Sequence, residues 1–324
     1  MESNQSRTET SDPMKEVREE KLFCDAVLRS EDGGVFPVHR VILSKCSAYF
    51  RKLFTTIQHT SEETDIVLRG VSSDMMTRIL DYVYFGEVDI RSDNAGQLLV
   101  TADNLCIPEL RKLCCDFLMD AIDMDNCIDI LRVARLLSFA DLKIHARRFV
   151  LRQFVELSQQ SEHLLELPVE ELQAIIEAEE LNVKEEKVVW ECILRWINRD
   201  PDNRKGHNAG LLKVARLGRL DAKFFNETVS KHPYVTENKA CKPLISETHK
   251  FLDDVERLSK EDKDLMTPRI ARPRIPQDIL FAIGGRRDGK VTDVIEAYDA
   301  RALFISCSFI SIAVKPLLRE ATKT

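Results

Sequence analysis

The sequence predicts an α+β domain, then an all-α domain of helical hairpins, and finally an incomplete β-structure at the C-terminal end. Three observations lead to this prediction. Strand-like and helix-like segments alternate over the first 120 residues, which is typical of an α+β domain. From Asp125 onward strand signals disappear over about 140 residues in favour of helical spacing of apolar residues. Two strand-like runs with a Gly-Gly pair return after Ile279.

The N-terminal domain begins with a predicted β-hairpin. An apolar run over residues 23–28, interrupted by Asp25, precedes a turn with Gly33 and Gly34 and a second run over residues 35–38. The spacing then becomes helical and predicts two short helices, through residues Val41, Ile42, Cys46, Tyr49, Phe50, Leu53 and Phe54.

The rest of this domain is predicted to contain one more strand and three helices. Residues 65–68 form the strand, and an apolar stripe that ends near Gly86 predicts a helix through Met75, Met76, Ile79, Leu80 and Val83. Further helices are predicted over residues 98–105 and 108–118.

The second region is predicted to be entirely helical. Its first stripe contains Ile128, Leu131, Ala134 and Leu137, and segments 142–154 and 168–177 continue in the same way. The clearest helix covers residues 185–198, with a stripe of Val188, Val189, Cys192, Ile193, Trp196 and Ile197. Asn182 and Glu185 match a capping box before this helix, and Pro201 ends it. Short connections indicate antiparallel helical pairs.

Residues 255–278 are charged and contain Pro268, Pro273 and Pro276, so they are predicted to be a stiff linker. We therefore expect the two folded domains not to depend on the chain beyond Pro268. Without further strands to pair with, the apolar runs of residues 279–314 are expected to stay disordered or to aggregate.

Charge and cysteine usage exclude several classes of function. The net charge of -7 and the pI near 5.7 argue against nucleic-acid binding, which needs clustered Lys and Arg. The nine cysteines are scattered without metal-ligand spacing, which indicates reduced thiols in the cytoplasm, with the nucleus as an alternative, and no metal site. The N-terminus lacks a signal peptide, and the apolar segment 302–314 is too short to span a membrane, so no membrane partner is expected.

The sequence also contains no convincing catalytic or cofactor motif. Gly284 to Lys290 matches the GxxxxGK spacing of a phosphate-binding loop, but Val291 stands where a Mg²⁺-binding Ser or Thr is needed. A strand-like run follows instead of a helix. The seven His residues are spread along the chain, and no cofactor is expected.

Several stretches together resemble the kelch-like family, whose members have a BTB domain, a BACK domain and a kelch β-propeller. The BTB-like stretches are FCDAVL and VHRVILSKCSAYFRKLF, the BACK-like ones are DNCIDILRVARLLSFADL and LLKVARLGRL, and Gly284-Gly285 with Tyr298-Asp299 is similar to a first kelch repeat. The resemblance implies a disordered N-terminus (1–13), a BTB dimerisation domain (14–120), a BACK domain (121–254), the linker (255–278), a partial kelch repeat (279–302) and a divergent tail (303–324).

The kelch-like pattern is interrupted after its first strands. Ile305 occupies the place of the expected Trp, and no second Gly-Gly pair follows. One hairpin cannot build a propeller, because each blade has four strands and packs against its neighbours. We therefore expect an unfinished first blade, and no client protein is assigned because the propeller that would recruit it is missing.

The resemblance further implies homodimerisation through the BTB domain and docking to a cullin-3-type scaffold. The implied dimer residues are Phe23, Asp25, Arg40, Val41 and Ser44, with Asp25 and Arg40 as a charged pair. The implied cullin-binding residues are Phe54, Gln58, His59, Tyr84, Ile128 and Leu131. Many cullin-binding relatives have an apolar-x-Glu triplet where this chain has Gln58-His59-Thr60, so weaker binding is expected.

The resulting hypothesis is a non-catalytic adaptor of a cullin-3-type ubiquitin ligase whose client-recruiting propeller is missing. The alternative is a self-associating structural scaffold, for example one associated with actin. A BTB transcription factor is a third class, against which the absence of zinc-finger spacing and of a basic region argues. Retention of a cullin by the purified chain separates the first two hypotheses.

Overall fold

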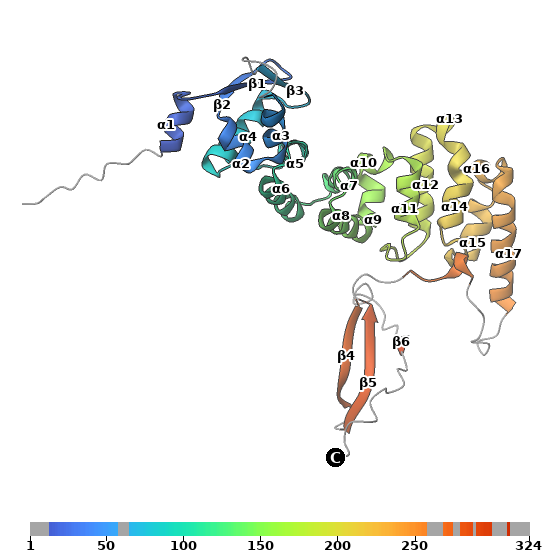
Figure 1. Cartoon of the computed structure of the whole chain (residues 1–324). Helices are drawn as coiled ribbons and strands as arrows, with labels where there is room; N and C mark the ends of the chain where they lie inside the picture. Colours follow the sequence, from blue (N-terminus) through green and yellow to red (C-terminus); the bar gives the residue numbers. More distant parts are fainter. Residues whose placement is uncertain are drawn as a thin grey trace, which may run out of the picture. The chain divides into compact units, whose positions relative to one another are not determined.

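The computed structural model describes residues 13–57, 65–257, 268–274, 279–287, 290–299 and 310–311. The chain divides into two compact units, residues 1–147 and 148–324 (Figure 1). The first contains a small sheet with helices, and the second contains the helical stack and the C-terminal strands. The fold is α+β with a short sheet, followed by a helical region, as the sequence predicts.

A three-stranded sheet forms one layer of the first unit. Its strands are β1 (Ala26–Ser30), β2 (Val35–Val38) and β3 (Asp65–Leu68), in the order β2-β1-β3. β1 pairs antiparallel with β2 and parallel with β3. Alternate residues of the central strand, including the fully buried Leu28, face the core, which is the period-2 burial expected of a half-covered sheet.

The first unit also contains helices, several of which contact one another. They are α1 (Pro13–Glu19), α2 (Arg40–Cys46), α3 (Ala48–Ile57), α4 (Ser73–Phe85), α5 (Ala95–Asn104), α6 (Pro108–Asp120) and α7 (Cys127–Leu136). The predicted stripe of α4 is confirmed in full: Met75, Met76, Ile79, Leu80 and Val83 are buried. The helix starts at Ser72, whose hydroxyl accepts from the Met75 N–H, and ends at Gly86 with φ of 73°.

The prediction of a strand from residue 23 is wrong for its first three residues. β1 begins at Ala26, because Lys21 and Phe23 adopt φ values of 55° and 59° and therefore form turns. Helix α1, which precedes these turns, contacts α4 within the same unit.

The second unit is a stack of short helices. Its helices are α8 (Ala140–Arg152, which begins in the first unit), α9 (Phe154–Gln160), α10 (Glu162–Leu165), α11 (Val169–Ile176), α12 (Lys187–Arg199), α13 (Pro201–Arg204), α14 (Asn208–Val214), α15 (Ala222–Phe224), α16 (Pro233–Thr236) and α17 (Lys242–Arg257). Helix α12 contacts α9, α10 and α14, which places it in the middle of the stack. Its side chains Trp190 and Trp196 are buried, as predicted for packing residues.

Three local predictions in this unit need correction. The segment 142–154 is not one helix, because α8 ends at Arg152 and α9 begins at Phe154. The capping box is absent: α12 begins at Lys187, and the Asn182 side-chain amide instead donates to the Arg152 carbonyl. Pro201 follows the end of α12, as predicted, but it also begins helix α13 as its first residue.

The predicted linker 255–278 also differs from the structure. Helix α17 continues to Arg257, and residues 268–274 return to the helical stack, where they include the 3-10 turn Arg269–Ala271. In this returning segment Ile270, Ala271 and Arg274 are buried. The described part of the linker is therefore packed against the helical unit.

The C-terminal strands form a second sheet. β4 (Ile279–Arg287) pairs antiparallel with β5 (Lys290–Asp299), as the predicted hairpin requires, and the register shifts between Ile283 and Gly285. A short strand, β6 (Ile310–Ser311), adds to β5. Lys290 starts a strand rather than a helix, which removes the phosphate-loop alternative. That the hairpin belongs to a propeller blade stays a prediction.

Within the residues that the structure describes, no helix is both long and apolar enough to cross a membrane. The same residues contain no cluster of three or more metal-ligating side chains. The eight cysteines among them are free thiols.

Candidate functional site

Several apolar side chains in the N-terminal part of the first unit are exposed. Phe23 is 86% exposed and Val41 is 75% exposed, and Leu22 and Val35 are exposed as well. Phe23 also has φ of 59°, a left-handed conformation that non-glycine residues rarely adopt. A large aromatic side chain held out into solvent by an unfavourable backbone conformation is typical of a residue that packs against a partner.

The predicted dimer residues Asp25 and Arg40 are in contact, and the side chain of each bonds to the backbone of the other. The Arg40 backbone N–H donates to Asp25 Oδ1 at 2.8 Å, and Arg40 Nε donates to the Asp25 carbonyl at 3.1 Å. Asp25 therefore satisfies a free N–H in the first turn of α2. Ser44, on the same helix, is half-buried, and its carbonyl accepts from Arg51 Nε.

A buried hydrogen-bond network fixes the turn that precedes Phe23. His39 Nε2 lies 2.7 Å from the Leu22 carbonyl, and His39 Nδ1 lies 2.7 Å from the Tyr84 hydroxyl. The Arg18 guanidinium, from α1, lies over the Tyr84 ring at 4.9 Å. Burial raises the pKa of Tyr84, so the phenol stays protonated and continues to donate.

Four of the six predicted cullin-binding residues are buried rather than exposed. Phe54, Tyr84, Ile128 and Leu131 are all buried in the first unit, where they pack in its core. Gln58 and His59 lie outside the described residues. These four side chains present little surface to a partner, and their part in cullin binding stays a prediction.

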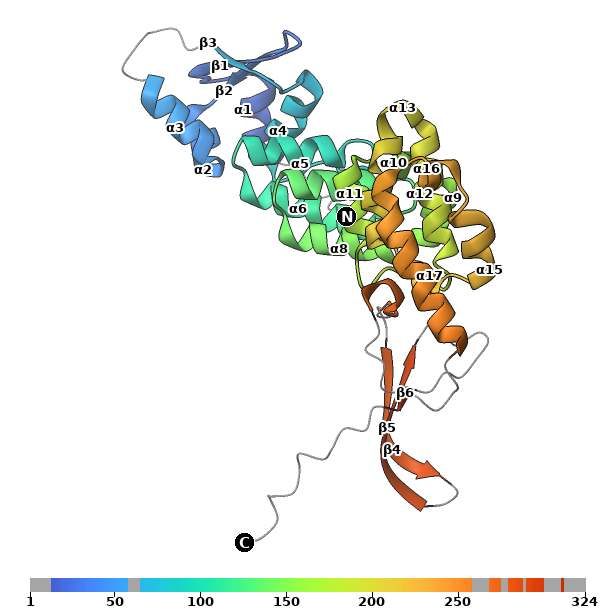
Figure 2. The same cartoon turned by 90° about the vertical axis from the view of Figure 1, so that its right-hand side faces the viewer.

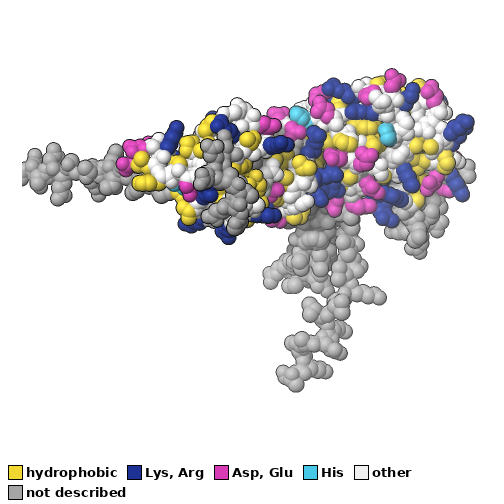
Figure 3. Space-filling view, turned by 45° about the horizontal axis from the view of Figure 1, so that its top comes forward, with side chains coloured by type: hydrophobic (Ala, Val, Ile, Leu, Met, Phe, Trp, Pro, Cys, Tyr) yellow, Lys and Arg dark blue, Asp and Glu magenta, His cyan; other side chains and the backbone are white. Residues whose placement is uncertain are grey.

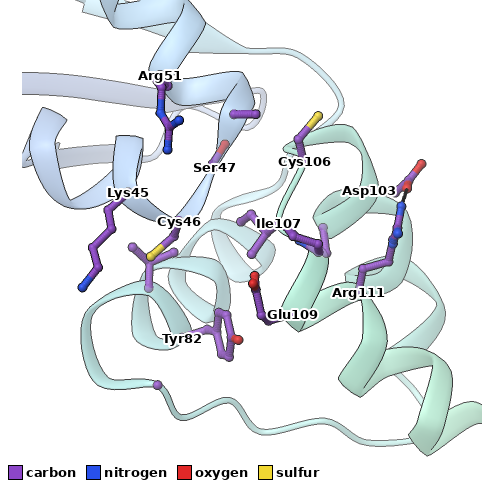
Figure 4. A pocket seen from close by; sticks show the side chains of 15 residues that line it. Lys45, Cys46, Ser47, Arg51, Tyr82, Asp103, Cys106, Ile107, Glu109 and Arg111 are labelled. Atoms are coloured by element: carbon purple, nitrogen blue, oxygen red, sulfur yellow. Dashed lines mark hydrogen bonds and ion pairs between the residues drawn. The ribbon is translucent and has the colours of Figure 1, made fainter.

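The first unit also has a hollow in its surface, lined by helix ends and turns. It is a groove of about 900 Å³ between the α2–α3 junction, the end of α4 and the α5–α6 turn (Figure 4). Figure 4 shows Cys46, Tyr82, Ile107 and Glu109 approaching the same space from three elements. The basic side chains of the groove are Lys45, Arg51 and Arg111, and its acidic ones are Asp103 and Glu109.

The groove walls are held by local hydrogen bonds. The Ser47 hydroxyl donates to the Leu105 carbonyl at 2.6 Å and accepts from the Phe50 N–H, which joins the start of α3 to the α5–α6 turn. In that turn Cys106 has φ of 51° and is exposed. Burial, with Glu109 as the next cause, raises the pKa of Tyr82, so this phenol stays neutral in the groove.

Sequence reasoning did not find this groove. Its residues come from positions 45–51, 82–86 and 102–111, which no single periodic stripe connects. One signal in the sequence could have indicated a groove wall here. Pro108 follows Ile107, and a proline is common at the first position of a helix, so it predicts a junction between two helices at this point.

The charged side chains do not form a large patch of one sign on the face drawn in Figure 3. Lys and Arg side chains lie among Asp and Glu side chains over this face. This mixture gives a phosphate backbone no continuous basic track on the visible surface.

Comparison with known proteins finds two domain families in succession. Residues 14–122 match the BTB/POZ domain, and residues 127–230 match the BACK (BTB And C-terminal Kelch) domain. Among solved structures, the BTB domain of zebrafish PATZ1 is 23% identical, with a TM-score of 0.30, and the match covers 33% of this chain and 86% of that chain. The chain therefore contains a BTB domain followed by a BACK domain, the order found in proteins of the kelch-like type.

Proposed function

We propose that this chain is a self-associating, non-catalytic adaptor that docks a cullin-3-type ubiquitin-ligase scaffold. The observation that carries the proposal is the succession of a BTB domain and a BACK domain, an architecture typical of adaptors. Such domains commonly associate with themselves and with cullin-3.

Self-association is supported by the exposed pair of Phe23 and Val41. Both side chains are more than two-thirds exposed, and both belong to the set that the kelch-like resemblance assigns to the dimer. A second copy of the chain is the partner that we propose for this surface. An obligate interface of this kind buries on the order of 2,000 Å² or more.

For the cullin we propose the groove between α2–α3, α4 and the α5–α6 turn as the docking surface. It lies on the helical side of the BTB domain, it combines apolar walls with charges of both signs, and its volume of about 900 Å³ is large enough for inserted side chains.

The test is retention of an N-terminal cullin-3 fragment by the purified chain, with two matched variants. Ala48→Arg places a long side chain on an exposed residue that lines the groove, and Ala240→Arg makes the same change on an exposed residue of the second unit. We expect wild type and Ala240→Arg to retain the cullin and Ala48→Arg to lose at least tenfold in affinity.

The other outcomes are equally informative. Failure of the wild-type chain to retain cullin contradicts the adaptor proposal and favours a structural scaffold. Equal retention by Ala48→Arg leaves the adaptor function standing but contradicts the groove as the docking surface.

A further inference from the structure

Residues 268–274, here called the arginine strap, are bound to the second unit by a buried ion pair. Arg274 Nε lies 2.6 Å from Glu186 Oε1, and Arg274 Nη2 lies 3.1 Å from Glu186 Oε2. The side chains of Arg274 and Glu186 are 2% and 4% exposed. This two-point geometry fixes the orientation of the guanidinium as well as its position.

The same guanidinium also closes the end of a helix. Arg274 Nη1 donates to the carbonyls of Ile176 and Ala178, both at 2.8 Å. These carbonyls belong to the C-terminal end of α11, where backbone acceptors lack partners within the helix and where a positive charge is favoured. Glu186 precedes the first residue of α12, where a negative charge is favoured. Arg274 therefore connects two helix ends with the charge that each end prefers.

A second arginine of the helical unit lies beneath the strap. Arg216 pairs with Glu179 at 3.0 Å, and its Nη1 faces the Arg269 and Arg272 carbonyls at 3.4 and 3.3 Å. On the strap itself, Arg269 forms an ion pair with Glu177. The strap thus meets two carboxylates of the segment between α11 and α12, Glu177 and Glu186, and Arg216 joins Glu179 to the strap's backbone.

Apolar contacts complete the site. Ile270 and Ala271 of the strap are buried. A Cβ atom added to Gly218 would lie 3.1 Å from the Ala271 Cβ, so the absence of a side chain at Gly218 allows this close approach. In Figures 1 and 2 the segment before β4 lies against the helical stack.

We propose that the second unit contains an arginine-binding site, formed by Glu186, Glu177 and the α11 end carbonyls, whose ligand is the chain's own residues 268–274. The proposal is independent of cullin docking. The bound strap fixes the point from which the C-terminal strands leave the helical unit.

Chain length shows what binding of the strap changes. β4 begins five residues after Arg274, which corresponds to a reach of about 17 Å at about 3.4 Å per residue. Without the strap, the free segment would run from Arg257 to Ile279, a reach of about 75 Å. The strap therefore determines whether the strands after Pro276 are held near the helices or move on a long tether.

Hydrogen exchange of the full-length chain, read by mass spectrometry on peptides that cover residues 268–274, tests the proposal. The Ala271 and Arg272 N–H groups donate to the Pro268 and Arg269 carbonyls, so their exchange reports whether the strap is bound. Arg274→Lys keeps the charge but loses the two-point geometry, and we expect about ten- to hundredfold faster exchange of the strap. Arg272→Lys, the same change on an exposed strap residue, is the control and should stay within twofold.

A second variant changes the strap without touching the charges of the site. Ile270→Ala removes a buried apolar side chain of the strap, so exchange of the strap should again increase at least tenfold while peptides of α12 stay protected. The proposal is overturned if neither Arg274→Lys nor Ile270→Ala speeds exchange, or if Arg272→Lys has the same effect. Loss of protection in α12 to the same extent in Ile270→Ala also overturns it, because the segment would then be inseparable from the core.

Discussion

The Tyr84 hydroxyl lies 2.7 Å from His39 Nδ1 and accepts a second hydrogen bond, 3.0 Å long, from the His39 backbone N–H. His39 Nε2 faces the Leu22 carbonyl, an acceptor, so Nε2 carries a proton and donates to it. The network joins α4 to the turn that exposes Phe23.

Tyr84→Phe should destabilise the first unit by about 1–3 kcal/mol, because it leaves the buried His39 N–H and ring nitrogen without partners. Tyr82→Phe removes a hydroxyl from the same helix without breaking a hydrogen bond that the structure shows, and it serves as the control. The two tryptophans of the chain, Trp190 and Trp196, both belong to the second unit, so Trp fluorescence follows the unfolding of that unit. A transition that appears in calorimetry but not in Trp fluorescence therefore belongs to the first unit. Equal losses in the two variants would contradict the role of the network.

Asp32 should make the first unit sensitive to acid. Its carboxylate accepts from the Ser30 hydroxyl, from the Ser73 hydroxyl at 2.6 Å and from the Ser73 N–H. These hydrogen bonds, with that from Ser30 as the largest cause, hold the pKa of Asp32 well below its usual range. The folded protein therefore binds the proton more weakly than the unfolded chain, and the contribution to stability is present above a pH of about 4 and is lost as the pH falls further.

The measurement is calorimetry of the first unit between pH 2 and pH 6. Asp32→Asn should lower stability near neutral pH and flatten the decline below pH 4. Asp202→Asn removes a carboxylate that is 97% exposed and should leave the profile unchanged. An Asp32→Asn profile parallel to that of wild type would show that the decline arises elsewhere.

Dimerisation should depend on the exposed apolar side chains of Phe23 and Val41. Val41→Asp places a charge in the proposed interface without disturbing the core, because Val41 is 75% exposed, and we expect a monomeric mass by light scattering at micromolar concentration. Val255→Asp changes an exposed valine of α17 and should stay dimeric. A monomeric mass of the wild-type chain under these conditions would contradict the prediction.

Cullin affinity should rise when the missing triplet is restored. The double substitution Gln58→Leu/Thr60→Glu supplies an apolar anchor worth roughly 1.5–3 kcal/mol of burial, about ten- to hundredfold in affinity. Isothermal titration with an N-terminal cullin-3 fragment measures the difference, and Gln159→Leu, at an exposed position of α9, controls for a general gain in apolar surface. Identical affinities of the double variant and wild type would show that the triplet is not the anchor in this chain.

Local periodicity explains which parts of the fold could be predicted. The buried stripe of α4 and the buried Trp196 of α12 could be predicted from helical spacing alone. In each helix, the apolar residues that indicate burial lie on one face of that same helix. Phe23 could not be placed in this way. An apolar residue next to a strand is predicted to continue it, and only the contact between His39 and the Leu22 carbonyl shows why the chain turns there.

The candidate site and the strap depend on contacts between distant residues. Arg274 and Glu186 are separated by 88 positions, and Arg274 lies in a segment without any periodic pattern. Charged residues near prolines are usually solvated, so the segment resembled a linker.

The strap should therefore stabilise the second unit, in contrast to the sequence-based expectation that nothing beyond Pro268 matters. Two truncated chains test this: one ends at Pro276 and keeps the strap, and the other ends at Pro268 and loses it, while both lack the C-terminal strands. Without Arg274 the buried Glu186 carboxylate has no cationic partner, and removal of one member of a buried pair costs about 3–5 kcal/mol. Trp fluorescence, which reports only the second unit, should show the shorter chain melting several degrees or more below the longer one. Coincident melting curves of the two truncated chains would mean that Glu186 is solvated or otherwise paired without Arg274, and the strap would then contribute no stability to the helical unit.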